Sequence, residues 1–428
     1  MNAPAALLRT LSLPDAEHSC PQRLGWMQGQ PPRPERRIRW DDGSAYLFPQ
    51  LRWSFCHLDR LLPTQAVPRG AGPATALPLA PRGDLDDLEF TPVASRATRR
   101  FGEAIAQSYT DGILVLHRGR IVHERYLGGL APDGPAGRHA AMSVTKSLVG
   151  TLGLLALLDG TLDAQRPLTH YLPELAGSGF AGATVDQLLD MSTALDYAED
   201  YTDPDAGIWR HAQAGGLLPR PAGWQGPEGF DAFVRSVGPL AGASHGHSFG
   251  YRTVNADALA LLLRRISGQD LPSLMSQRLW QPMGAEADAF FSVDGQGTAF
   301  GGGGLGCTLR DLARFGELLR CDGAVGPRQV LPAALVARLR AGGCPETFAR
   351  ARQPLLRGWT YRAMWWVTHN PHGAFMARGV HGQTLYIDPL AEMVIARFAS
   401  HPLPANVMTD PLLLRAWHAL GRHLLLNG

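Results

Sequence analysis

One serine and one lysine stand at a spacing that could support nucleophilic catalysis. Of the 40 lysine and arginine positions in the chain, only Lys146 is lysine. Arginine stays protonated in proteins, whereas a desolvated lysine can become a neutral amine and act as a base. Ser143 stands three residues earlier, in the S-x-x-K pattern, which on a helix places hydroxyl and amine on one face. The pair predicts a serine nucleophile with a lysine base, although ordinary serine usage gives this spacing by chance about one time in twenty.

Two further stretches carry side chains suited to such a site. Tyr251 lies in the run 247–255, just before an amphipathic segment, with Arg252 beside it. A phenol next to a cation could be deprotonated or relay a proton to and from Ser143, but it could equally be a tyrosine packed at a helix start. The glycine-containing run 379–384 leads into a strand pattern, and glycine allows the backbone to approach a ligand closely.

Together, the three stretches resemble the motifs of the class C β-lactamase and penicillin-recognising serine hydrolases, in the order of that superfamily. Ser-Val-Thr-Lys at 143–146 matches the first motif. Tyr-Arg-Thr at 251–253 occupies the place of Tyr-x-Asn, and His-Gly-Gln at 381–383 the place of Lys-Thr-Gly. The resemblance covers roughly residues 100–400 and is supported by the stretches 188–192 and 302–315.

Two departures from the β-lactamase pattern point to one branch of the superfamily. Thr253 stands where those enzymes have asparagine and His381 where they have lysine, which argues against penicillin hydrolysis. These variants, and the acidic and aromatic stretch 195–204, are similar to the 6-aminohexanoate-dimer hydrolase branch, which hydrolyses short linear amides and carboxylic esters. Asp203 in that stretch and Asp205 just after it could meet a cationic substrate end or be solvated loop charges. Tyr197 and Tyr201 receive no role.

The resemblance implies a mechanism without metal or cofactor. Ser143 would attack the carbonyl and form an acyl-enzyme, Lys146 would act as base, and Tyr251 would pass the proton to the leaving group. The backbone N–H groups of Ser143 and Thr384 would form the oxyanion hole. The pocket would be completed by His381, Gln383 and Thr253. The resemblance also implies an α/β fold of the β-lactamase and transpeptidase type, with an antiparallel sheet flanked by helices and an inserted, mostly helical subdomain.

The length of 428 residues predicts more than one packed unit. Residues 1–98 are rich in Pro, Arg and Gly and are expected to form a wrapping segment. Residues 99–160 and 291–428 are expected to form the α/β subdomain, and 161–290 the helical one. The pattern predicts a hairpin over 112–126, a nucleophile helix from Ser143 to Asp159-Gly160, strands at 384–388 and 393–398, and helices at 185–191, 256–266, 309–319 and 411–426.

Composition excludes several classes of protein. The net charge is +2 and the arginines are scattered, so nucleic-acid binding is not expected. The longest apolar run, about 148–158, is too short to cross a bilayer, and residues 1–20 lack the apolar core of a secretory signal. Five widely spaced cysteines argue against a disulfide framework or zinc site. We therefore expect a cytoplasmic protein acting on a small amide or ester, with a homodimer left open.

The sequence also allows two alternatives to a β-lactamase-like hydrolase with Ser143 as nucleophile. Gly246 to Gly250 matches G-x-S-x-G, which would make Ser248 the nucleophile of an α/β-hydrolase esterase, yet a Gly/Pro loop rather than a strand precedes it. The chain could also be a non-catalytic scaffold of the same fold, because fold does not dictate function. A scaffold gives no reason for the sole lysine to stand at position 146.

Overall fold

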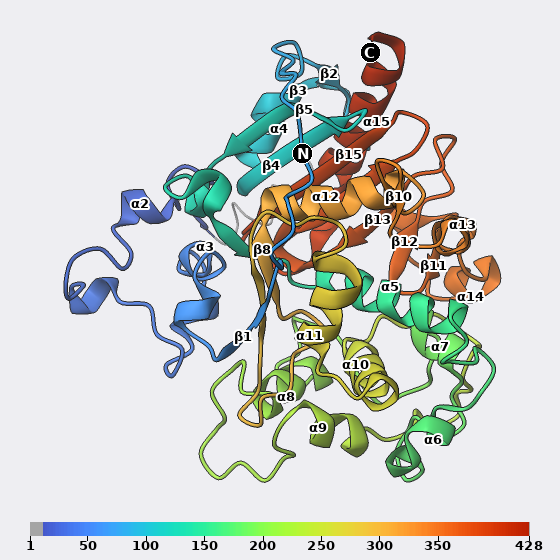
Figure 1. Ribbon diagram of the computed structural model, residues 1–428. Coiled ribbons are helices and arrows are strands. Elements are labelled where there is room, and N and C mark those ends of the chain that lie inside the picture. The colour runs from blue at the N-terminus through green and yellow to red at the C-terminus, as the bar shows by residue number, and fades with distance from the viewer. Residues whose placement is uncertain (1–11, 428) are drawn as a thin grey trace.

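The computed structural model describes residues 12–427, and a seven-stranded antiparallel sheet forms its centre (Figure 1). The strand order is β11-β12-β13-β14-β15-β4-β5. Every residue of β4 is buried, because helices cover both faces of the sheet. The strands are β4 Thr110–His117, β5 Arg120–Tyr126, β11 Thr360–Arg362, β12 Trp365–Val367, β13 Phe375–Arg378, β14 Thr384–Asp388 and β15 Met393–Ala399.

The hairpin and strands expected in this sheet are confirmed. Strands β4 and β5 are joined at Arg118 and Gly119, whose φ angles of 52° and 73° are those of a tight hairpin turn. Strand β14 has the expected bounds, and β15 extends one residue further than expected, to Ala399. The architecture is the expected α/β arrangement of an antiparallel sheet flanked by helices.

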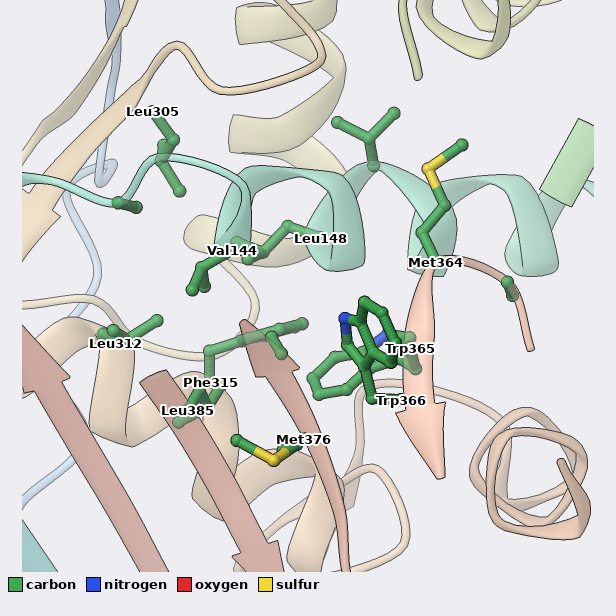
Figure 2. Packing of buried hydrophobic residues seen from close by; sticks show 14 of the residues in the cluster. Val144, Leu148, Leu305, Leu312, Phe315, Met364, Trp365, Trp366, Met376 and Leu385 are labelled. Atoms are coloured by element: carbon green, nitrogen blue, oxygen red, sulfur yellow. The ribbon is translucent and has the colours of Figure 1, made fainter. Parts of the chain in front are cut away.

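Two helices on one face of the sheet connect it to the rest of the protein. Helix α5 (Val144–Leu158) follows the S-x-x-K serine, and α12 (Leu309–Arg320) packs on β14, β15 and β4. Figure 2 shows Val144 and Leu148 of α5 pointing toward Leu312 and Phe315 of α12. On the other face lie α4 (Phe101–Gln107) and α15 (Asp410–Asn427) (Figure 1).

Helix α5 is held tightly against the sheet by polar contacts as well as by apolar packing. The Trp365 indole N–H donates to the Ser147 carbonyl at 3.0 Å, and the Ser147 hydroxyl donates to the Met364 carbonyl at 2.6 Å. Gly150 comes so close to the β11–β12 turn that an added Cβ would lie 2.0 Å from the Ala363 carbonyl oxygen. The helix that begins at Ser143 therefore has a fixed position relative to the sheet.

The chain between α5 and β7 consists of helices joined by long loops and lies on the far side of α5 from the sheet (Figure 1). Its central helix, α10 (Val254–Ser267), packs on α5, α7 and α9 and is slightly longer than the expected 256–266. Thr184 and Gln187 form a capping box at the start of α7. The other helices are α6 Leu168–Tyr171, α7 Val185–Leu189, α8 Gly207–Ala214, α9 Phe230–Ser236 and α11 Leu271–Met275.

A second, four-stranded antiparallel sheet was not expected. Its order is β1-β7-β8-β6, with β1 Thr64–Val67, β6 Arg138–Ala140, β7 Ala289–Ser292 and β8 Leu305–Thr308. The expected subdomain boundary at 290 falls inside β7, and the division into subdomains stays a prediction. The segment expected to wrap the protein supplies edge strand β1. The expectations for residues 1–98 and for a missing signal in 1–20 both include residues 1–11, which lie outside the described residues.

The remaining elements are short and peripheral, and none changes the architecture. They are α2 Pro21–Leu24, α3 Leu51–Ser54, α13 Ala333–Ala341, α14 Pro345–Ala349, and the pairs β2 Glu89–Phe90 with β3 Arg99–Arg100 and β9 Ala324–Val325 with β10 Arg328–Gln329. Within residues 12–427, no helix combines the length and the apolar character needed to cross a membrane.

Candidate active site

The first turn of α5 brings the serine and the lysine of the S-x-x-K pattern into contact. Ser143 is the residue that caps the helix, and Lys146 lies one turn further on. The Lys146 ammonium donates to the Ser143 hydroxyl oxygen at 2.8 Å and to the Gly302 carbonyl at 2.6 Å. Both side chains are buried, with 8% and 1% of their surface exposed.

The surroundings of Lys146 favour the neutral amine. Burial lowers its pKa from 10.5 to about 8, although the carboxylates of Glu199 and Asp257 partly offset this effect. Near neutral pH a fraction of the molecules therefore carries an amine with a free lone pair. In that form the amine can still donate to Gly302, while the Ser143 hydroxyl donates to its lone pair.

A buried histidine and carboxylate hold the turn that supplies the lysine's carbonyl partner. The Gly302 N–H donates to one carboxylate oxygen of Asp257 at 3.2 Å. The imidazole Nε2 of His211 lies 3.0 Å from the other oxygen, and both side chains are almost completely buried. The position of the Gly302 carbonyl, and with it the direction of the Lys146 amine, depends on this pair.

Tyr251 lies beside the serine and lysine, on the loop that precedes α10. Its ring stacks on Trp366 with centroids 5.6 Å apart, and the Lys146 nitrogen is 5.1 Å from the ring centroid. Burial, followed by the charge of Glu199, raises the Tyr251 pKa far above its ordinary value, and a hydrogen bond with Ser143 only partly opposes this. The expectation that this phenol could be deprotonated is wrong, because the buried site disfavours phenolate; the role of proton carrier is compatible with the geometry.

The neighbouring cation expected to act on Tyr251 is engaged elsewhere. The Arg252 guanidinium donates to the carbonyls of Thr193 and Gly250, at 3.0 Å and 3.2 Å. The arginine that faces Tyr251 across the site is Arg378, whose charge lowers the phenol pKa slightly. Sequence proximity therefore pointed to the wrong arginine.

Glu199 is a site residue to which the sequence assigned no role. Its carboxylate accepts hydrogen bonds from the Thr253 backbone N–H at 2.7 Å, the Thr253 hydroxyl at 3.0 Å and the Tyr201 hydroxyl at 2.7 Å. Glu199 thereby fixes the start of α10, directly after Tyr251. Thr253 lies at the site as expected, but both of its donors point to this carboxylate.

The third expected stretch enters the site through its first residues. His381 has a φ of 59°. Its Nδ1–H donates to the His401 carbonyl at 2.7 Å, so this nitrogen carries the proton. Burial lowers the His381 pKa to about 4, so its imidazole is neutral. Val380 precedes it and lies beside Ser143.

Gln383 and Thr384 do not lie where they were expected. The Gln383 side chain is fully buried, donates to the Ala399 carbonyl at 2.6 Å and accepts from the Ala399 N–H at 3.0 Å. Because these hydrogen bonds to Ala399 of β15 occupy its amide group, Gln383 cannot line a pocket. Thr384 is paired with Arg378 and Arg397 inside the sheet. Neither Gln383 nor Thr384 borders the two hollows, described below, that reach Ser143.

Two backbone N–H groups at the site are free to bind a substrate. Among the described residues, the N–H groups of Ser143 and Val380 have no hydrogen-bond acceptor, and both residues border the same hollows. Unpaired N–H groups that converge on one point can bind a developing oxyanion. Val380 thus has a free backbone N–H at these hollows, whereas Thr384, the second donor expected from the sequence, does not border them.

Two hollows meet at Ser143 and share Tyr201, Val380 and Pro404 in their walls. The first, which we call the apolar hollow, has a volume of about 220 Å³. It is lined by Tyr46, Phe55, Leu58, Leu62, Met142, Ser143, Tyr201, Ile208, Trp209, Ala212, Leu217, Leu218, Thr253, Ser292, Phe300, Gly302, Gly303, Val380, His381, Pro402 and Pro404. The N-terminal segment thus forms part of the wall.

The second, which we call the Tyr251 hollow, has a volume of about 360 Å³. It is lined by Ser143, Glu199, Tyr201, Tyr251, Gln353, Pro354, Leu355, Leu356, Trp366, Arg378, Gly379, Val380, Pro404, Ala405, Asn406, Val407 and Asp410.

Within residues 12–427, no group of three or more His, Cys, Asp and Glu side chains is placed to hold a metal ion.

The other residues of the acidic and aromatic stretch have different surroundings. Tyr201 borders both hollows, whereas Tyr197 is buried with its hydroxyl 3.1 Å from His211 Nδ1. Asp203 and Asp205 are exposed and border neither hollow, so they are solvated loop charges.

The surroundings of Ser248 do not suit a nucleophile. No strand precedes it, and its hydroxyl donates to the adjacent Phe249 carbonyl at 3.2 Å. Ser248 borders neither of the hollows at Ser143. The α/β-hydrolase alternative is wrong, because the strand and turn that would expose such a serine are absent from this described part of the chain.

Comparisons with known proteins agree with this geometry. Residues 99–416 match the Beta-lactamase family. The 6-aminohexanoate-dimer hydrolase of Paenarthrobacter ureafaciens is 36% identical over 383 residues, which cover 89% of this chain and 91% of that enzyme.

Solved structures show the same fold. A Bacillus anthracis protein, provisionally named a 6-aminohexanoate-dimer hydrolase, superposes with a TM-score of 0.81 and 28% identity, over 89% of this chain and 96% of its own. A penicillin-binding protein homologue from Caulobacter crescentus has a TM-score of 0.55 and 16% identity, over 74% of this chain and 96% of its own.

Proposed function

Because this chain belongs to the β-lactamase family and is a serine hydrolase of amides and esters, we propose that it cleaves short linear amides and carboxylic esters through an acyl-enzyme on Ser143. The relative from Paenarthrobacter ureafaciens suggests substrates of the size of a 6-aminohexanoate dimer. The observation that carries the proposal is the 2.8 Å contact between Ser143 and a buried lysine whose pKa lies near 8. A cytoplasmic location and a homodimer stay predictions from the sequence.

Each proposed step uses a group already in place. The neutral Lys146 amine accepts the Ser143 proton as the hydroxyl oxygen attacks the substrate carbonyl. The N–H groups of Ser143 and Val380 bind the resulting oxyanion. Tyr251, which remains protonated, donates its proton to the leaving nitrogen or oxygen and is reprotonated through Lys146. A water molecule activated by the same groups then releases the acid.

Labelling with a fluorophosphonate probe, followed by peptide mapping, tests the nucleophile. We expect a single adduct on Ser143 in the wild-type protein and none in Ser143→Ala. An adduct on Ser248 would transfer the chemistry to the other serine. A correctly folded protein that forms no adduct would favour the non-catalytic scaffold.

The pH dependence of kcat/KM tests the base. Since the reaction needs neutral Lys146, whose pKa is about 8, kcat/KM should rise about tenfold per pH unit below pH 7 and level off above pH 8. No fall is expected up to pH 10, because the Tyr251 pKa is raised well above its ordinary value. Initial rates with an uncharged ester in constant-ionic-strength buffers measure the profile; a flat profile between pH 6 and 8 would contradict lysine as the base.

A further inference from the structure

We propose that the apolar hollow holds the acyl part of the substrate and selects an uncharged, apolar acyl chain, while the leaving group lies in the Tyr251 hollow. This inference rests on the proposed acyl-enzyme at Ser143 and adds the substrate class. It predicts that an acyl chain ending in an ammonium group is a poor substrate, although such a chain forms the acyl half of a 6-aminohexanoate dimer.

The orientation follows from which groups border each hollow. Ser143 and Val380, the proposed attacking residue and oxyanion donor, border both hollows, so the carbonyl lies where the hollows meet. Tyr251 borders only the second hollow. Because Tyr251 donates its proton to the leaving atom, the leaving group lies on that side, and the acyl chain extends into the apolar hollow.

The apolar hollow offers no carboxylate to a cation. Of the described residues that line it, none is Asp, Glu, Lys or Arg. Leu58, Leu217 and Phe300 are typical of its wall, and His381 is neutral because its pKa is about 4. An ammonium group that entered this hollow would lose its hydration without gaining a carboxylate, which strongly opposes binding.

The charged side chains that line the two hollows all border the Tyr251 hollow. They are Glu199, Arg378 and Asp410, and the Arg378 guanidinium donates to both Asp410 oxygens at 2.6 Å. A polar or ionised leaving group can exchange hydration for these side chains, whereas an acyl chain in the other hollow cannot. The two hollows therefore differ in the charge that they accept.

The test compares two amides that differ by one group. Heptanoyl and 6-aminohexanoyl p-nitroanilide have acyl chains of equal length, ending in methyl or ammonium. At pH 7 we expect kcat/KM to be at least 100-fold higher for the heptanoyl compound. Equal values, or a preference for the ammonium compound, would overturn the proposal.

A pair of variants tests which hollow selects between the methyl and the ammonium end of the acyl chain. Leu218 is half-buried on the wall of the apolar hollow, and Leu218→Asp should shift the ratio at least tenfold toward the ammonium substrate. Leu355→Asp, on the wall of the Tyr251 hollow, is the matched control and should leave the ratio within threefold of wild type. A larger shift for Leu355→Asp would mean that the acyl chain lies on the other side, and the proposal would be wrong.

Probe labelling separates this proposal from the function on which it rests. If Ser143 is labelled but heptanoyl amides and esters are not hydrolysed, the acyl assignment fails and the nucleophile stands. If Ser143 is not labelled in folded protein, the proposed function fails first.

Discussion

Replacing Lys146 with methionine should lower kcat by about ten-thousandfold, because the nucleophile loses its base while its position on α5 is kept. Methionine has nearly the length of lysine and suits a fully buried site. Lys146→Arg should be equally inactive, since arginine keeps the charge but cannot accept a proton. Steady-state hydrolysis of a p-nitrophenyl ester, against a Ser143→Ala background for residual activity, measures both variants.

The unfolding temperature of the Lys146 variants shows whether a loss of activity comes from the missing base or from a damaged fold. Burial depresses the Lys146 pKa below its unfolded value, so the buried amine costs stability below about pH 8 and this cost disappears as pH rises toward 10.5. Methionine removes the cost but leaves the Gly302 carbonyl without its donor. We expect the unfolding temperature of Lys146→Met at pH 7 to equal or exceed that of the wild type. Near-normal activity in either lysine variant would refute the mechanism.

Removing the Tyr251 hydroxyl should have the second largest effect, and its size should depend on the leaving group. Tyr251→Phe should slow hydrolysis of an alkyl amide about 100-fold to 1000-fold, because an amine leaves only when it is protonated. An ester with a p-nitrophenolate leaving group needs no proton and should be slowed much less. The measurement is kcat/KM for both substrates with each protein.

Tyr361→Phe is the matched control for this prediction. The Tyr361 ring packs edge-on against Tyr251 with centroids 6.3 Å apart, and it borders neither hollow at Ser143. Removing its hydroxyl should change neither rate by more than about twofold to threefold. Equal losses for the amide and the ester in Tyr251→Phe would assign the phenol a structural role instead.

Local patterns allowed much of the large sheet and its helices to be predicted. The hairpin of β4 and β5 needs only two neighbouring apolar runs and a turn, and α5 is marked by its apolar run and terminal glycine. The four-stranded sheet could not be predicted in this way. Its strands are only three or four residues long and come from distant parts of the chain. Strand β1 at 64–67, for example, pairs with β7 at 289–292, and such pairing leaves no local period in the sequence.

The site shows the same division between local and distant information. Ser143 and Lys146 are neighbours on one helix, so their spacing suffices to place them together. Val380 borders the same hollows as Ser143, and the chain turns directly after it, at His381, with a positive φ that the sequence His-Gly-Gln did not reveal. Glu199 acts through Thr253, 54 residues away, and no pattern within its own stretch indicates that partner.

The walls of the apolar hollow have two origins in the chain. Tyr46, Phe55, Leu58 and Leu62 precede residue 99, where the match to the Beta-lactamase family begins, whereas Ser143, Lys146 and Tyr251 lie within it. Part of the wall proposed to select the acyl group is thus encoded outside the stretch that encodes bond cleavage. Mutations before residue 99 can broaden or change the range of substrates during evolution without disturbing the catalytic residues. Relatives with the same catalytic residues therefore need not share a substrate.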